Sequence, residues 1–215
     1  MKTIYLVRHG ETYFNKNGKV QGWCDSLLTE TGIAQAERVG KMFAENHTTF
    51  DAAWISDMGR TRKTANIILY QSKNQALNLY ETPLLRETSF GKFEGGSSEG
   101  MWHEVGPVIG RPDFNDSFPS AEKILALEGI KKLDTLKIAE NFTDVKVRAR
   151  RLLDELKNSG SSVILLVSHS LFISILLRVI GDFDADHVPN ASITKIIYHE
   201  GHFCPEYIGK VEQFK

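Results

Sequence analysis

The sequence is poor in cysteine, carries almost no net charge and contains no long apolar run. Its two cysteines, Cys24 and Cys204, are isolated and form no CxxC pair, so we expect reduced thiols in a cytoplasmic protein. No apolar run reaches the length of a membrane span, and Met1 leads almost directly into a predicted strand, so we expect neither a membrane segment nor a signal peptide. A formal charge of −1 offers no general basic surface, and we expect no nucleic-acid or membrane partner.

What is present is the composition of an ordinary globular domain. Of the 215 residues, 41% are hydrophobic and 25% are charged, values that are typical of soluble proteins. A chain of this length can bury a sizeable core, and no internal repeat or low-complexity segment interrupts it. We therefore predict a single domain over residues 1–215.

Strand and helix patterns alternate along the chain. Uncharged runs predict strands over residues 3–7, 52–55, 77–80 and 162–167. The segments 193–199 and 203–208, joined across Gly201, predict a terminal strand pair. Apolar residues at helical spacing predict helices over residues 31–44, around 64–68, across 145–157 and over 171–180. The predicted fold is α/β: a three-layer α/β/α sandwich with a mostly parallel sheet and helices on both faces.

The alternation breaks down between residues 89 and 119. This stretch is rich in glycine and aromatic residues, among them Phe90, Phe93 and Trp102, and lacks clear periodicity. A long irregular stretch in a compact domain is usually functional, and its aromatics argue against disorder. Residues 120–157 are mostly helical, with predicted interruptions near Gly129 and at 141–143. We expect residues 89–142 to form a lid insertion over the carboxyl-end edge of the sheet.

Polar residues follow four of the predicted strands. His9, preceded by Arg8, comes directly after the first strand, and Arg60, Glu87 and His169 come after three others. Because parallel strands joined by helices present their carboxyl ends at one edge of the sheet, these side chains can converge there. Asn15 lies six residues beyond His9 and can return to the same place. His169 also precedes a helix, whose free amides favour an anion.

These residue types suit phosphoryl transfer. An imidazole can attack phosphorus, guanidinium groups and a second imidazole can neutralise the phosphoryl oxygens, and a carboxylic acid can protonate the leaving oxygen. Taken alone, a histidine beside an arginine is more often an ordinary loop residue. The prediction of phosphoryl transfer therefore depends on the residues at all four strand ends together.

Sequence blocks in the same order resemble the histidine phosphatase superfamily, in its phosphoglycerate-mutase-like branch. The segment LVRHGET at residues 6–12 resembles the RHGE(T/S) signature of that family. Further similar blocks are QGWCDSLLTETG at 21–32, SDMGRTRKTA at 56–65, LRE at 85–87 with FGKFEG at 90–95, and VSH at 167–169. Ser170 departs from the family pattern, which usually has glycine after the second histidine, and this departure bears on the local geometry of the phosphate pocket.

The resemblance implies a role for each matching residue. It implies that His9 is the phosphorylated nucleophile and that Glu87 is the proton donor. It also implies that Arg8, Arg60 and His169 form the phosphate pocket, with Asn15 as a further contact. The family requires no metal ion and no organic cofactor, so we expect none here.

Two activities within this family, phosphatase and mutase, remain to be distinguished. A mutase must hold a doubly phosphorylated intermediate, which calls for extra basic residues in the lid. Between residues 88 and 119 the chain has two basic residues, Lys92 and Arg111, against five acidic ones. We therefore expect a phosphomonoesterase of broad specificity for small phosphorylated metabolites, with Phe90, Phe93 and Trp102 lining the lid. The alternatives are a cofactor-dependent phosphoglycerate mutase and a catalytically weak module that binds phosphorylated ligands. The chain is expected to be a monomer or a homodimer.

Overall fold

The fold is organised around a six-stranded, mostly parallel sheet. The computed structural model describes residues 1–212, and the strands lie side by side in the order β3-β2-β4-β1-β5-β6. Their bounds are β1 (Lys2–Arg8), β2 (Ala52–Ser56), β3 (Leu79–Thr82), β4 (Val163–Ser168), β5 (Ile193–His199) and β6 (His202–Lys210). The first four strands run parallel, whereas β5 and β6 are antiparallel to their neighbours. The predicted α/β class is confirmed.

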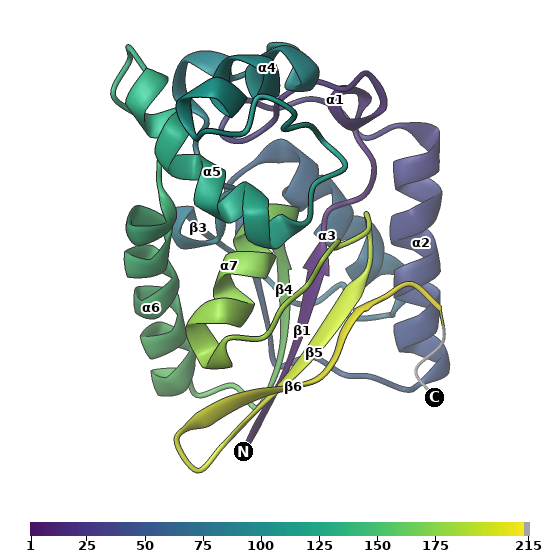
Figure 1. Cartoon of the computed structure of the whole chain (residues 1–215). Helices are drawn as coiled ribbons and strands as arrows, with labels where there is room; N and C mark the ends of the chain where they lie inside the picture. The colour runs from purple at the N-terminus through teal and green to yellow at the C-terminus, as the bar shows by residue number, and fades with distance from the viewer. Residues whose placement is uncertain (213–215) are drawn as a thin grey trace.

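Helices cover both faces of the sheet. On one face lie α2 (Glu30–Glu45) and α3 (Gly59–Gln71), and on the other lie α6 (Phe142–Asn158) and α7 (Ser170–Gly181) (Figure 1). Successive side chains of a strand point to opposite faces. Leu6 of β1 therefore joins the core beneath α6 and α7, whereas Val7 joins the core beneath α2 and α3. The central strands are thus buried on both faces, which explains why the residues between their ends are uncharged.

The helix α6 illustrates how the local sequence produces this packing. Asn141 caps its first turn by accepting from the Asp144 amide, and the Asp144 carboxylate accepts from the Asn141 amide. Val145, Leu152 and Leu156 recur at helical spacing and are fully or almost fully buried. The prediction that this stripe belongs to the core is confirmed.

The segment from residue 89 to residue 142 is more regular than its sequence indicates. It contains η2 (Gly91–Phe93), α4 (Ser98–Val108) and α5 (Ser120–Leu133), which lie beyond the carboxyl ends of β1 and β4 (Figure 1). The predicted interruption at Gly129 is wrong. α5 continues through this residue, where a Cβ would lie 2.6 Å from Ile109, so the glycine allows close helix packing. The side chains of this segment share one core cluster with those of α6 and α7.

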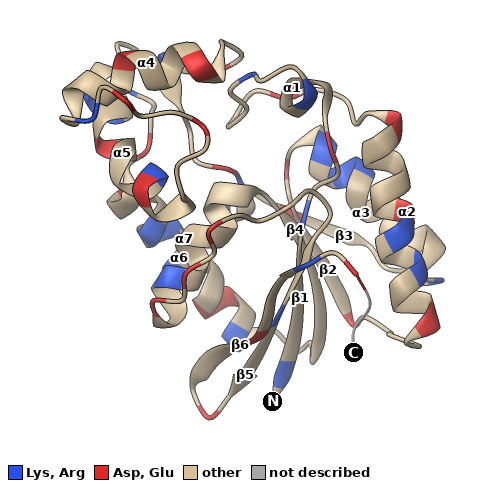
Figure 2. Cartoon of the chain, turned by 45° about the vertical axis from the view of Figure 1, so that its right-hand side comes forward, with Lys and Arg blue, Asp and Glu red and all other residues tan. Residues whose placement is uncertain are grey.

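The short helix α1 (Tyr13–Lys16) and the turn η1 (Pro83–Leu85) complete the fold. Basic and acidic side chains are interspersed over the helices (Figure 2). None of the helices in residues 1–212 combines the length and apolar character needed to cross a membrane. Cys24 is partly buried, Cys204 is exposed, and both are free thiols.

Candidate active site

The structure brings the four predicted strand-end residues together. His9 follows β1, Arg60 lies in the first turn of α3, Glu87 follows η1, and His169 immediately precedes α7. All four side chains are buried, with at most 6% of their surface exposed. The sheet order places β2, β4 and β1 next to one another, and the ring centroids of His9 and His169 are only 5.2 Å apart.

Arg60 determines the protonation pattern of His169. The Nδ1 atom of His169 accepts from the Nε and Nη2 atoms of Arg60 at 3.2 and 3.0 Å. Because a guanidinium group can only donate, the proton of a neutral His169 ring must lie on Nε2. That Nε2 atom is buried and has no hydrogen-bond partner among the described residues. Burial lowers the pKa of His169 well below 6.5, and the charge of Arg60 lowers it further, so the ring stays neutral.

The guanidinium of Arg60 is fully engaged by the protein. Besides its two contacts with His169, it donates to the carbonyl oxygens of Gly22 (2.7 Å) and Cys24 (2.8 Å) and to the Asp25 carboxylate (2.9 Å). These five contacts match the five N–H groups of an arginine. Arg60 therefore acts on the site through its charge and through His169, because no N–H group remains for a bound phosphate in this arrangement.

His9 is held in the opposite tautomer. Its Nδ1 atom lies 2.8 Å from the carbonyl oxygen of Gly10, which can only accept, so Nδ1 carries the proton and Nε2 has the free lone pair. Burial lowers the pKa of His9 well below 6.5, and the charges of Arg60 and Arg8 lower it further. The main-chain oxygen of His9 accepts from the Asn190 side chain at 3.1 Å. The ring is therefore neutral and held in the form that can act as a nucleophile.

Arg8 and Asn15 lie in the pocket beside His9. Arg8 donates through Nη1 to the Val188 carbonyl at 2.6 Å, while its buried Nε has no partner among residues 1–212. Burial lowers the pKa of Arg8 to about 10 despite the nearby carboxylate of Glu87, so the group stays charged at neutral pH. The side-chain oxygen Oδ1 of Asn15 accepts from the Asn190 side-chain amide at 3.3 Å and from the Thr12 main-chain amide at 3.2 Å. Arg8 and His169 thus each provide a buried donor that is free to bind an anion.

The carboxylate of Glu87 occupies the amino-terminal end of α7. It accepts from the main-chain amides of Leu171 (3.0 Å), Phe172 (2.8 Å) and Thr88 (2.9 Å). The sequence predicts that the amides of this helix favour an anion, but it does not reveal that the anion is Glu87. Burial raises the pKa of Glu87 above 4.5, although the three amides act in the opposite direction. A raised pKa favours the protonated form that a general acid needs.

His9, Glu87, Arg8 and Asn15 line a pocket of about 460 Å³, whereas Arg60 and His169 lie behind these residues and are not among those that line it. Phe90 and Trp102 line it, as the sequence predicts for the lid aromatics, whereas Phe93 is not among the lining residues and packs in the core. The rim also includes Asp116, one of the five acidic residues counted between residues 88 and 119. It further includes charged and polar side chains that sequence reasoning missed, namely Lys19, Gln21, Lys123, Asp186 and His187. Lys19, Lys123 and Asp186 lie outside residues 88–119, so a charge count over that stretch could not include them.

Hydrogen bonds tie the rim of the pocket together. The Asp116 carboxylate accepts from the indole of Trp102 at 2.6 Å and from the hydroxyl of Ser98 at 2.9 Å, both in α4. The Asp116 carbonyl accepts from the ammonium of Lys123 in α5 at 2.5 Å. The rim segments are therefore linked to one another through Asp116.

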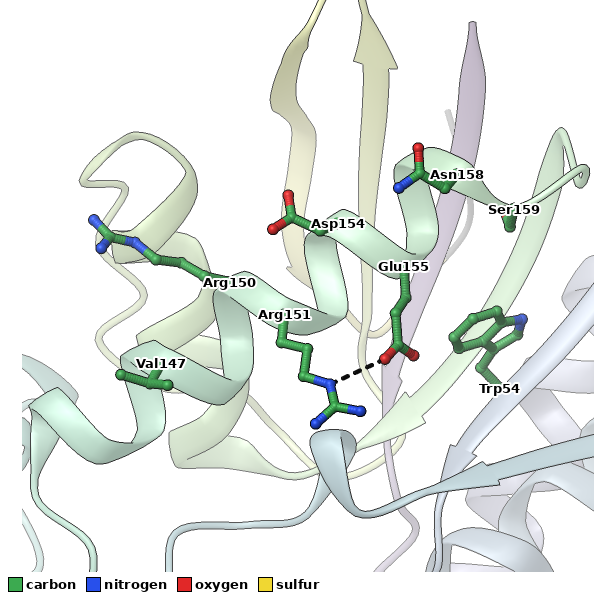
Figure 3. A pocket seen from close by; sticks show the side chains of 8 residues that line it. All are labelled: Trp54, Val147, Arg150, Arg151, Asp154, Glu155, Asn158 and Ser159. Carbon is green, nitrogen blue, oxygen red and sulfur yellow. Dashed lines mark hydrogen bonds and ion pairs between the residues drawn. The ribbon is translucent and has the colours of Figure 1, made fainter.

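A second hollow, of about 710 Å³, lies between α6 and Trp54 of β2 (Figure 3). Arg151 and Glu155, one turn apart on α6, pair at 3.2 Å along the edge of this hollow, and no histidine lines it. In residues 1–212 no three His, Cys, Asp or Glu side chains are grouped so that they could hold a metal ion. His9 and Glu87, by contrast, line the first pocket.

Comparisons with known proteins place this geometry in context. The family described as "Histidine phosphatase superfamily (branch 1)" matches residues 4–209. A 2,3-bisphosphoglycerate-dependent phosphoglycerate mutase of Bartonella henselae is 33% identical over 126 residues, which cover 57% of this chain and 61% of that protein. The chain thus spans about three fifths of this curated relative.

Solved structures match over more of the chain. Phosphoglycerate mutase from Bacillus anthracis is 32% identical with a TM-score of 0.86, covering 98% of this chain and 93% of the other. The alpha-ribazole phosphatase from Shigella flexneri has a TM-score of 0.75 at 22% identity, covering 99% of this chain and 98% of the other. The fold is thus shared by proteins named as mutases and as phosphatases.

Proposed function

Because the chain belongs to the histidine phosphatase superfamily (branch 1), we propose that it is a metal-independent phosphomonoesterase that works through a phosphohistidine at His9. The observation that carries the proposal is the pair of opposite histidine tautomers, with a free lone pair on His9 and an unpartnered N–H on His169. The first suits attack on phosphorus, and the second suits binding of a phosphoryl oxygen.

The proposed reaction has two steps. In the first, Nε2 of His9 attacks phosphorus, the bond to the leaving oxygen breaks, and Glu87 gives that oxygen its proton. Arg8 and His169 donate to the phosphoryl oxygens, and Arg60 adds its positive charge nearby. In the second, water attacks phosphorus of the phosphohistidine, the bond between phosphorus and Nε2 of His9 breaks, and the Glu87 carboxylate takes a proton from that water. His9 is then regenerated and inorganic phosphate leaves.

A mutase is the second candidate, and two observations favour it. The relatives with the highest identities above are named phosphoglycerate mutases, and Lys19 and Lys123 add positive charge to the rim. Two aspartates, Asp116 and Asp186, offset these two lysines. With no surplus of positive charge in the rim, a doubly phosphorylated intermediate would be poorly stabilised, so we place the phosphatase first.

The substrate we propose is a small phosphorylated metabolite, because a pocket of about 460 Å³ leaves room for little more than one such molecule. The rim combines aromatic and charged groups, which is consistent with broad specificity. A module that only binds phosphorylated ligands is a third possibility. It is less favoured because a nucleophile, an acid and two free donors are all present at the site.

The test is a phosphate-release screen over sugar, nucleotide, aryl and glycerate phosphates in excess EDTA, run beside a phosphoglycerate isomerisation assay. We expect phosphate release from several substrates, a phosphohistidine that can be trapped, and loss of both in His9→Ala. His103→Ala is a matched control, because that histidine is exposed on α4 and does not line the pocket. Fast isomerisation with negligible phosphate release would favour the mutase, and binding without turnover would favour the binding module.

A further inference from the structure

We propose that Arg148 is a positioning residue that holds the proton donor Glu87 in place, acting on its main chain from behind the pocket. This inference rests on the proposed function, in which Glu87 is the general acid. Arg148 lies on α6, 61 positions from Glu87 along the chain, and does not line the pocket. Its side chain is only 12% exposed.

Arg148 binds three carbonyl oxygens of the segment that carries Glu87. Its guanidinium donates to Leu84 at 3.2 Å, to Arg86 at 2.7 Å and to Glu87 itself at 3.0 Å. Three contacts from one planar group to one short segment restrict both the path and the rotation of that segment. The indole of Trp23 donates to the same Glu87 carbonyl at 3.0 Å, so this oxygen is held from two sides.

Glu140 holds Arg148 in the orientation that makes these contacts. Its carboxylate accepts from Nε and Nη2 of Arg148 at 2.8 and 2.9 Å, a bidentate pair that fixes the guanidinium plane. The same carboxylate accepts from the Ser89 amide at 3.0 Å, and the Glu140 amide donates to the Ser89 carbonyl at 2.9 Å. The chain is therefore bound on both sides of Glu87, at residues 84–86 and at Ser89.

Arg148 also contacts the helix end that receives the Glu87 carboxylate. Its guanidinium lies 4.8 Å from the ring centroid of Phe172, and the Phe172 amide donates to Glu87 at 2.8 Å. One buried cation thus supports both the main chain of the acid and the amide that binds its carboxylate. Neither contact reaches the phosphate-binding groups, and among these groups Arg148 acts on His169 only through its charge, which helps to lower the pKa of that ring. Loss of Arg148 should therefore affect the acid more than phosphoryl binding.

This difference gives a test based on the rates with two substrates. A general loss of structure should lower both rates equally, whereas displacement of Glu87 should lower mainly the rate that depends on the acid. An alkyl phosphate needs its leaving oxygen protonated, whereas 4-nitrophenyl phosphate releases a stable anion with little help. For Arg148→Met we expect the alkyl rate to fall by roughly tenfold to a hundredfold, as for a displaced catalytic group, and the aryl rate to fall by about threefold or less. Arg148→Lys, which keeps the charge, should recover part of the alkyl rate.

Arg151→Met is the matched control, because Arg151 lies on the same helix, has a side chain that is 73% exposed and, among residues 1–212, pairs only with Glu155 (Figure 3). Its rates on both substrates should equal those of the wild type. In the double variant Arg148→Met with Glu87→Gln, the loss on the alkyl ester should match that of Glu87→Gln alone, because both changes remove the same function.

Equal losses on the two substrates, or losses that add in the double variant, would overturn the inference. If Arg148→Met does not fold, the same comparison in Glu140→Gln decides the question. A phosphohistidine burst with the aryl substrate is measured in every variant. Its absence from the wild type would refute the proposed function itself, whereas its presence with an equal loss on both substrates would refute only the role of Arg148.

Discussion

Arg60 and His169 form a buried pair in which the arginine donates twice to Nδ1 of the histidine, so that the neutral ring carries its proton on Nε2. An arginine near a phosphate site is commonly assigned to binding the phosphate directly. Here its five N–H groups are all used by protein acceptors, three of them in the loop from Gly22 to Asp25. Arg60 therefore orients the Nε2–H donor of His169 and adds positive charge to the site.

The first prediction concerns that orientation. Arg60→Lys keeps the positive charge but loses the fork that fixes His169, so we expect kcat/KM to fall by about 10²–10³-fold, as for the loss of a donor that binds the transition state. NMR of the ring nitrogens of His169 should show that the proton no longer resides on Nε2 alone. Arg62→Lys is the control, since Arg62 is exposed and pairs with Glu81. Wild-type rates in Arg60→Lys would contradict the assignment.

The second prediction concerns the identity of the acid. Glu87→Gln keeps the shape of the side chain but removes its proton, so alkyl phosphates should lose about 10²–10⁴-fold in kcat. Aryl phosphates should lose much less, because a phenolate leaves without full protonation. For alkyl substrates the wild type should have its pH optimum on the acidic side of neutral, where the raised pKa of Glu87 keeps it protonated and the lowered pKa of His9 keeps it neutral. Similar losses for both substrate classes would show that another group is the acid.

The third prediction concerns stability and pH. Burial, with Arg60 close by, holds the pKa of His9 and of His169 well below 6.5. The unfolded chain takes up these protons near pH 6.5 while the folded chain does not, so the free energy of unfolding decreases as the pH falls below 6.5. Urea unfolding at about pH 7.5 and about pH 5.5 should show a loss of up to about 1.4 kcal/mol per pH unit for each histidine.

Glu87 contributes with the opposite sign. Burial raises its pKa above 4.5, so the folded state binds this proton more tightly and the contribution is lost as the pH rises through the folded pKa. The histidine effect is therefore best measured in Glu87→Gln. Replacing His169 by Asn in that background should reduce the slope by about half, since one of two buried histidines is removed. An unchanged slope would mean that His169 is protonated in the folded protein.

The fourth prediction tests the close approach of two site loops. A Cβ at Gly22 would lie 2.2 Å from the Thr88 carbonyl oxygen, a distance that real Cβ atoms do not adopt. Gly22→Ala must therefore separate the loop that binds Arg60 from the loop that follows Glu87. We expect it to destabilise the fold by about 1–3 kcal/mol and to reduce activity, measured by thermal unfolding and by phosphate release.

Gly160→Ala is the control for Gly22→Ala. A Cβ at Gly160 meets nothing within 4 Å, so the change should leave activity intact and alter stability by no more than about 1 kcal/mol, in the stabilising direction. If both alanine variants behave alike, the two loops are not packed as closely as the structure places them.

The sequence by itself determined the strands, most of the helices and the residues at the strand ends. The run from Val163 to Val167 is wholly apolar because both of its faces are buried, and the stripe of α6 repeats because one helix face packs on the core. Such patterns are local and can be read from neighbouring residues. Prediction failed where local pattern is weak, as in α4, whose two glycines and proline obscure its period.

Only the tertiary structure decided which donors meet which acceptors. The Glu87 carboxylate caps α7, 84 positions away along the chain, and Arg60 reaches His169 over 109 positions. Lys123 joins the pocket rim because α5 passes over the carboxyl end of the sheet. Residue spacing contains no information on these contacts, because each depends on the relative placement of elements that only packing brings together.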